Sequence, residues 1–235
     1  MLRLVVATDP CETASAILVE EILEVLRKRP QARLAIPGGS ALSAMSETRA
    51  RLGDAWRRVA LTWTDERCVP FDDVDSNRGA AARLGLFSPD RRDTKEVHPV
   101  VVLPLYLDAE TPAQAVSRVS AGFATEFRDA LDVVLLGMGS DGHVASLFPS
   151  LASPTAGRVA HVSKSPKPPA SRITLTRAAL ATAGRVVLVA AGEAKREALS
   201  RLVAGDSSLP AQGLGGLVIV TDLAGIEAEG SHNGE

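Results

Sequence analysis

Short runs of apolar, β-branched residues alternate along the chain with longer segments whose apolar positions recur at helical spacing. The run 2–7 is apolar apart from Arg3, and the apolar positions after it recur every three or four residues until position 26. This pattern predicts a strand followed by a helix. Asp9 can cap the helix and Pro10 can occupy its first turn, where a missing N–H costs little.

The same cycle repeats towards the C-terminus. Further strands are predicted at 33–36, 59–64, 100–106, 132–137, 172–176, 186–191 and 217–221, and helices at 41–52, 112–127 and 193–203. Strands that alternate with helices are typical of a parallel sheet covered on both faces. The sequence therefore predicts a Rossmann-like, doubly wound α/β fold with a mostly parallel sheet. We expect a single α/β domain over 1–226 and a polar, disordered tail over 227–235.

Composition excludes several classes of protein. Of 235 residues, 46% are hydrophobic and 23% are charged, which is typical of a globular chain rather than a disordered one. The net charge of −2 leaves no global basic field for nucleic acid or an anionic membrane. The first apolar run is too short for an export signal, and no stretch approaches the roughly 20 apolar residues of a spanning helix.

Cysteine and histidine positions bear on compartment and on metal binding. Cys11 and Cys68 are the only cysteines, which indicates a reducing compartment, and we expect a cytoplasmic protein. The histidines are scattered without a spacing typical of metal ligands, so we expect no metal site.

Three loops rich in glycine or charge each follow a predicted strand. They are Gly38-Gly39-Ser40, Asp65-Glu66-Arg67 and 137–143. Ligands of open parallel sheets bind beyond the carboxyl ends of the strands, so these loops are expected to share one rim. The first loop is either a phosphate cradle at a helix N-terminus or an ordinary turn with a helix cap. The second offers either catalytic carboxylates or an ion-pair cluster that positions Arg67, and spacing does not separate the two.

The glycine-rich loop resembles two well-known motifs without satisfying either. Residues 137–142 match G-x-G-x-x-G, but the acid expected about 20 residues later is missing and Pro149 interrupts the crossover helix, which disfavours a dinucleotide site. The nucleophile elbow G-x-S-x-G fails because position 138 is methionine. The glycines still let backbone N–H groups approach a ligand, and Gly139, Ser140 and Gly142 are the candidates.

His143 ends this loop, and Asp141 stands two residues before it. A carboxylate near an imidazole orients the ring and stabilises its charged form, which is typical of a general base. A lone histidine is also compatible with a purely structural or surface position. We favour the catalytic interpretation, with His143 as base and Asp141 as its partner.

The stretch from His143 to Gly192 contains no Asp or Glu. It carries six basic residues, which are Arg158, Lys164, Lys167, Arg172, Arg177 and Arg185. In a chain of net charge −2 this indicates a local positive field suited to a small anion, although six scattered, solvated charges would give the same pattern. Lys195, after Gly192, either adds an ammonium to the same rim or is a surface residue.

Together these residues resemble the 6-phosphogluconolactonase family. Residues 136–149 (LGMGSDGHVASLFP) are similar to its G-x-G-x-D-G-H-x-A-S-L-F-P signature. Residues 65–70 (DERCVP) with Ser76-Asn77 resemble a second block, and 165–176 (SPKPPASRITLT) resemble a third. The sequence departs from the family where Ala41-Leu42 replaces the usual Thr-Pro, and where the strand 217–222 lacks a tryptophan.

The resemblance implies hydrolysis of 6-phosphoglucono-δ-lactone to 6-phosphogluconate, in the oxidative pentose phosphate pathway. His143 would activate a water, with Asp141 orienting it, and no cofactor or metal would be required. Backbone N–H groups of the glycine turn, with Gly139, Ser140 and Gly142 as the candidates, would stabilise the tetrahedral oxyanion. The phosphorylated lactone would be the only partner implied, and we expect a monomer or a weak homo-oligomer that binds neither nucleic acid nor membrane. The residues implied to hold the substrate and its phosphate are Gly38, Gly39, Ser40, Arg67, Arg172 and Lys195.

Two other functions are compatible with this superfamily. A glucosamine-6-phosphate deaminase would share the D-G-H turn but continue with an Asn-Glu pair, whereas this chain has Ser146-Leu147-Phe148-Pro149. A sugar-phosphate sensor would bind without turnover and would carry a DNA-binding module, for which we see no room before Gly38.

Overall fold

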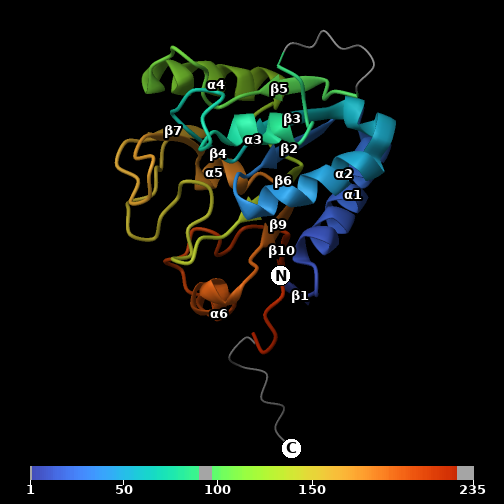
Figure 1. The fold of residues 1–235 in the computed structure, drawn as a ribbon, viewed down its shortest axis with the longest axis vertical. Coiled ribbons are helices and arrows are strands. Elements are labelled where there is room, and N and C mark those ends of the chain that lie inside the picture. Colours follow the sequence, from blue (N-terminus) through green and yellow to red (C-terminus); the bar gives the residue numbers. More distant parts are fainter. Residues whose placement is uncertain (1, 90–96, 227–235) are drawn as a thin grey trace, which may run out of the picture.

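A seven-stranded parallel sheet forms the centre of the computed structural model, which describes residues 2–89 and 97–226 (Figure 1). All of its strand pairs are parallel. The strands lie in the order β1 (Arg3–Val6), β10 (Leu217–Thr221), β9 (Arg185–Val189), β6 (Val133–Gly137), β2 (Ala32–Ile36), β3 (Val59–Trp63) and β5 (Val101–Leu103). The prediction of an α/β protein with a mostly parallel sheet is confirmed.

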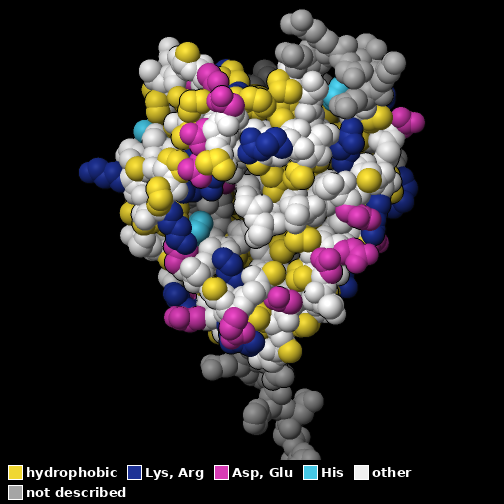
Figure 2. Space-filling model, in the orientation of Figure 1, with side chains coloured by type: hydrophobic (Ala, Val, Ile, Leu, Met, Phe, Trp, Pro, Cys, Tyr) yellow, Lys and Arg dark blue, Asp and Glu magenta, His cyan; other side chains and the backbone are white. Residues whose placement is uncertain are grey.

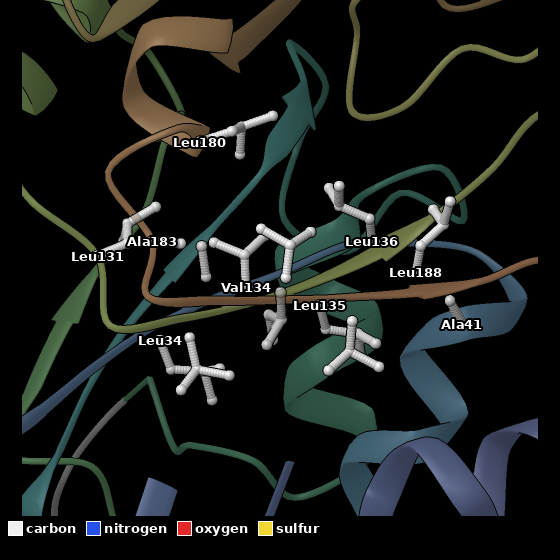
Figure 3. Close-up of a cluster of buried hydrophobic side chains, with 14 of the residues drawn as sticks. Leu34, Ala41, Leu131, Val134, Leu135, Leu136, Leu180, Ala183 and Leu188 are labelled. Atoms are coloured by element: carbon white, nitrogen blue, oxygen red, sulfur yellow. The ribbon is translucent and has the colours of Figure 1, made fainter. Parts of the chain in front are cut away.

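Helices cover both faces of this sheet. On one face, α1 (Pro10–Lys28) packs against β9, β10 and β6, and α2 (Ala44–Leu52) packs on α1. The other face carries α5 (Arg177–Leu180), and Figure 3 shows Leu180 on the side of β6 opposite to α1 and α2. The remaining long helix, α4 (Pro112–Glu126), lies beside β5. As predicted, the Asp9 side chain caps α1 by accepting the Glu12 N–H at 2.9 Å.

Strand β6 shows why these apolar runs become central strands. Its side chains alternate, so that Val134 and Leu136 point to one face and Leu135 to the other (Figure 3). All three are fully buried because both faces are covered. A strand buried on both sides is therefore apolar throughout, which is the pattern seen in the sequence.

A second, three-stranded antiparallel sheet corrects the sequence prediction. It contains β4 (Asp65–Arg67), β8 (Arg172–Leu175) and β7 (Val159–Val162). We expected Asp65-Glu66-Arg67 to be a loop and 172–176 to join the main sheet. The whole of β8 is buried, so its sequence resembles that of a central strand although its partners are short and antiparallel.

Several shorter elements also differ from the prediction. The segment 65–77 is followed by a helix, α3 (Asn77–Arg83), capped by the Ser76 side chain. The predicted helix 41–52 begins as the 3₁₀ turn η1 (Ser40–Ser43), and 193–203 divides into η3 (Glu193–Lys195) and α6 (Arg196–Val203). A further 3₁₀ turn, η2 (Gly53–Arg58), leads into β3. The predicted tail 227–235 lies outside the described residues, so the domain boundary at 226 stays a prediction.

The chain changes direction across the sheet between β2 and β6. From β2 it continues to β3 on one side, and from β6 it continues to β9 on the other. The loops that leave the carboxyl ends of these neighbouring strands therefore diverge and leave a crevice between them, which is where open α/β sheets bind their ligands.

At the amino ends of the parallel strands, away from the crevice, an ion-pair cluster joins the beginnings of β2, β6 and β9. The Asp132 carboxylate accepts hydrogen bonds from Nε and Nη2 of Arg33 at 2.8 and 2.7 Å, and from Arg29 at 2.7 Å. Its backbone also pairs with Arg33 and with Arg185. Burial alone would raise the pKa of Asp132, but the hydrogen bonds and charges of Arg33 and Arg29 lower it below its usual range.

We expect Asp132→Ala to lower the free energy of unfolding by about 3 kcal/mol at neutral pH, because it leaves the Arg33 guanidinium largely buried without its partner. Since the folded-state pKa of Asp132 is depressed, its contribution is present at neutral pH and is lost as the pH falls below about 4. Urea unfolding at pH 7 and pH 3 measures both effects. Asp54→Ala, which removes an ion pair whose carboxylate is 92% exposed, is the control and should change little. Equal losses for the two variants would contradict the assignment.

Within the described ranges, no helix is both long enough and apolar enough to cross a membrane. Figure 2 shows one face of the molecule, on which acidic and basic side chains are interspersed.

Candidate active site

A cavity of about 310 Å³ lies at the carboxyl ends of β2, β6 and β9. All three loops that the sequence placed at one rim contribute to it, so that prediction is confirmed. Eight of the predicted site residues line the cavity, namely Gly38, Gly39, Ser40, Arg67, Gly139, His143, Arg172 and Lys195. The other three, Ser140, Asp141 and Gly142, belong to the turn behind His143 and are not part of the lining.

The cavity also contains residues that sequence reasoning did not assign to the site. Asp65 and Asn77 belong to the motif blocks noted above, and Lys167 belongs to the acid-free stretch, so each had a signal in the sequence. Met138, Ala145 and Pro168 also lie in motif blocks, but a small or apolar lining residue is indistinguishable from a core residue until the fold is known. These six residues complete the lining together with Pro37, Ala41 and Gly137.

His143 and Asp141 form a close pair. Nδ1 of His143 lies 2.5 Å from Oδ1 of Asp141, and the imidazole stacks on Phe148 with 4.6 Å between ring centroids. The imidazole lines the cavity, and among the described residues Nε2 has no hydrogen-bond partner. Because Asp141 holds Nδ1, Nε2 is the nitrogen that can take a proton from a molecule in the cavity.

The pair is poised for proton transfer. Burial lowers the pKa of His143, against the opposing effect of Asp141, so the ring is neutral at neutral pH. Burial would raise the pKa of Asp141, but the hydrogen bond and charge of His143, helped by Lys167, lower it to about 2. A neutral imidazole oriented by an ionised carboxylate has the protonation state of a general base.

The turn that carries this pair is tightly constrained. Gly142 has a φ of +82°, and a Cβ placed on Gly139 would lie 2.0 Å from Nδ1 of His143. Two of the three amides that we expected to face a ligand are occupied within the turn. Gly139 N–H donates to the His143 carbonyl at 2.8 Å, and Gly142 N–H donates to the Gly139 carbonyl at 3.0 Å.

The Gly38-Gly39-Ser40 loop closes another side of the cavity. Gly39 has a φ of +67° and precedes η1, and no side chain caps that turn, so the helix-cap interpretation of Ser40 is wrong. Gly38 packs directly on Asn77, whose Oδ1 lies 1.8 Å from where a Cβ would stand. The glycines thus bring bare backbone up to the cavity, which is compatible with a phosphate cradle.

The Asp65-Glu66-Arg67 segment is mainly structural. Glu66 accepts hydrogen bonds from the backbone N–H groups of Arg67, Asn77 and Arg78 at the start of α3, and burial raises its pKa to about 7. The Asp65 carboxylate lines the cavity and accepts a hydrogen bond from Ser146 Oγ at 2.7 Å. Both carboxylates are therefore held in structural contacts. The ion pair, however, joins Asp65 to Arg172 at 3.6 Å, and among the described residues neither carboxylate pairs with the Arg67 guanidinium as the ion-pair interpretation expected.

The acid-free stretch supplies the cavity with two of its six basic residues. Lys167 and Arg172 line the cavity, whereas Arg158 and Arg177 donate to backbone carbonyls and Arg185 pairs with Glu21. Lys195 supplies a further cation from η3, and burial and the nearby charge of Lys167 lower its pKa. On the face drawn in Figure 2, a histidine is bordered by basic side chains left of centre. Among the described residues, no group of three or more His, Cys, Asp or Glu could hold a metal ion.

Residues 7–218 match the sequence model of the family described as glucosamine-6-phosphate isomerases/6-phosphogluconolactonase. The chain belongs to this family. It is similar to a 6-phosphogluconolactonase of Streptomyces coelicolor, with 36% identity over 216 residues that cover 87% of this chain and 82% of that protein.

Two solved structures share the fold. The crystal structure of a 6-phosphogluconolactonase from Thermotoga maritima has a TM-score of 0.78 at 23% identity and covers 94% of this chain and 99% of its own. A monomeric glucosamine-6-phosphate deaminase has a TM-score of 0.71 at 18% identity and covers 93% of this chain and 96% of its own. The fold alone therefore does not separate the two activities.

Proposed function

We propose that the protein hydrolyses 6-phospho-D-glucono-1,5-lactone to 6-phospho-D-gluconate, the second step of the oxidative pentose phosphate pathway. The observation that carries the proposal is the neutral, Asp141-oriented His143 facing a cavity that also contains Lys167 and Lys195. The Streptomyces coelicolor relative described above supports the same reaction, because it is named a 6-phosphogluconolactonase.

The chemistry requires one general base. Nε2 of His143 removes a proton from a water molecule as the water oxygen bonds to C1 of the lactone, and the carbonyl electron pair moves onto its oxygen. The tetrahedral intermediate then collapses, the bond between C1 and the ring oxygen breaks, and the imidazolium returns its proton to that oxygen. The products are an alcohol and a carboxylic acid, which releases a proton at neutral pH. A base of this kind contributes roughly 10²–10⁴-fold to the rate.

We assign the phosphate of the substrate to the part of the cavity that Gly38, Gly39 and Ser40 line. The backbone of Gly38 and Gly39, the Ser40 hydroxyl and the Lys195 ammonium offer donors and positive charge, and Arg67 borders them. The Arg67 guanidinium is held by the Asp75 carbonyl at 2.6 Å.

The deaminase alternative lacks a second catalytic carboxylate at the expected place. Where such an enzyme would carry an Asn-Glu pair, this chain has Ser146, Leu147 and Phe148, and all three side chains are buried. Ser146 itself bonds to Asp65. Deamination with ring opening needs more than one positioned acid or base, whereas lactone hydrolysis needs only one.

A direct assay tests the proposal. With the lactone generated in situ, we expect acid release well above the spontaneous rate, and no ammonia from glucosamine 6-phosphate. Ammonia release at a comparable rate would replace the proposal with the deaminase. Binding of both compounds without either reaction would replace it with the sensor.

We also propose that the reaction proceeds without a metal or organic cofactor, in the cytoplasm, in a monomer or weak homo-oligomer that binds neither nucleic acid nor membrane. The near-neutral charge balance supports the lack of binding to nucleic acid and membrane. The single-base chemistry supports a reaction without a metal or cofactor. Turnover unchanged by EDTA, after dialysis, is the expected result.

A further inference from the structure

The side chain of Arg172 is committed to one loop. Its Nε donates to the Pro169 carbonyl at 3.0 Å, and its Nη2 donates to the carbonyls of Lys167 and Pro168 at 3.1 and 3.0 Å. We call residues 165–169 the strap. On the other side of the guanidinium, Nη1 lies 3.6 Å from Oδ2 of Asp65. Arg172 is 3% exposed, so little of it can reach a ligand.

The strap carries Lys167 to the catalytic base. Nζ of Lys167 lies 3.3 Å from Oδ1 of Asp141, which is the same oxygen that holds Nδ1 of His143. The Lys167 side chain lines the cavity and is 41% exposed, so its ammonium is open to a bound molecule. Ser165 Oγ also donates to the Lys167 carbonyl, at 2.7 Å, so this carbonyl accepts hydrogen bonds from two side chains.

Lactone hydrolysis needs a donor or a cation where negative charge develops on the carbonyl oxygen. The turn 139–142 is poorly placed to supply it, because the amides of Gly139 and Gly142 already donate within the turn and Ser140, the third candidate, does not line the cavity. The ammonium of Lys167 contacts the His143–Asp141 pair directly, through Oδ1 of Asp141. Its charge is therefore positioned at the reacting end of the substrate rather than with the backbone of Gly38 and Gly39.

We propose that Lys167 is a catalytic residue that stabilises the oxyanion formed from the lactone carbonyl, and that Arg172 is a positioning residue that acts through the strap rather than by holding the phosphate. This inference rests on the proposed lactonase function. It replaces the expectation, implied by the family resemblance, that Arg172 contacts the sugar phosphate.

Lys167 also affects the pKa of His143 and with it the pH dependence of the reaction. The charged groups that face His143 are Asp141 on its own turn, Lys167 on the strap and Asp65 on β4. The two carboxylates raise the pKa of the imidazole, and the Lys167 ammonium lowers it. Removal of the ammonium therefore raises the pKa of His143, and the acid limb of the rate profile should move to higher pH.

Lys167→Met is the first test. We expect kcat to fall roughly 10²–10³-fold on both the phosphorylated lactone and unphosphorylated gluconolactone, with the acid limb shifted to higher pH. Lys164→Met, in the neighbouring part of the same segment, is the matched control and should retain wild-type kcat and pH profile. Lys195→Met should instead raise KM for the phosphorylated lactone alone. A Lys167→Met variant that loses activity only through KM for the phosphorylated substrate would show that Lys167 is a phosphate ligand and overturn the inference.

Arg172→Lys tests the positioning role, because it keeps a cation beside Asp65 but loses the donors to the strap. It should reproduce the loss of kcat on both substrates and the pH shift, and adding it to Lys167→Met should cause little further loss. Independent, multiplicative losses, or a loss confined to the phosphorylated lactone, would contradict it.

If Arg172→Lys does not fold, Ser165→Ala takes its place, since it removes the other side-chain hydrogen bond to the Lys167 carbonyl. A smaller fall in kcat on both substrates is expected, and an unchanged kcat would overturn the role of the strap. Absence of lactonase activity in the wild-type protein would instead reject the proposed function itself.

Discussion

Replacement of His143 by asparagine should remove most of the catalysed rate, roughly 10²–10⁴-fold, while the fold is retained. Asparagine can occupy the turn beside Asp141, but its amide cannot accept a proton from water. The loss should appear in kcat for both phosphorylated and unphosphorylated lactones, measured as acid release corrected for spontaneous hydrolysis.

The pH profile of the wild-type enzyme gives an independent test. Only the neutral imidazole can act as the base, so the rate should fall as the pH drops through the pKa of His143. Because burial lowers that pKa, the midpoint should lie below the ordinary histidine value of about 6.5. His161→Asn is the control, since His161 is exposed on β7 and bonds to Ser171 at 2.9 Å, away from the cavity. Near wild-type turnover by a folded His143→Asn variant would refute the assignment.

A comparable loss of activity is expected from Gly139→Ala, although Gly139 contributes no side chain to the reaction. The new methyl group would stand 2.0 Å from Nδ1 and 2.2 Å from Cε1 of His143, and 2.5 Å from Oδ1 of Asp141. Those atoms cannot remain where they are, so the imidazole and the carboxylate must separate or turn. We expect a fall in kcat of about 10²-fold, because small displacements of catalytic groups have effects of that size.

Gly215→Ala is the matched control, because a Cβ at position 215 would meet nothing within 4 Å and the backbone there is not left-handed. Steady-state kinetics and thermal melts of the two variants separate a local effect from unfolding. A Gly139→Ala variant with normal kcat would show that the pair does not need the geometry seen here.

The regular part of the fold was predictable from the sequence because its elements follow simple periodicities. Strand β6 and helix α1 illustrate this, since one is buried on both faces and the other on a single stripe. The shared rim was predictable as well, because loops after parallel strands always lie on the same edge.

The second sheet and the strap were not predictable on the same basis. Residues 65–67 pair with 172–174 across more than a hundred positions, and no local pattern encodes such a pairing. The roles of Arg172 and Lys167 depend on it. Charge alone indicated that both belong to one positive surface, whereas the structure buries the first and exposes the second.

The place of β1 in the sheet determines how late in synthesis the sheet can be completed. Strand β1 emerges first from the ribosome, but its hydrogen-bonding neighbour is β10, whose residues 217–221 emerge after every segment of the cavity. Until then β9 also has an open edge. Helix α1, which packs on β9 and β10, has no complete surface to cover before that point. Part of the apolar stripe of α1 therefore stays uncovered until β10 has been made, and during that period a cotranslational chaperone would have most to protect.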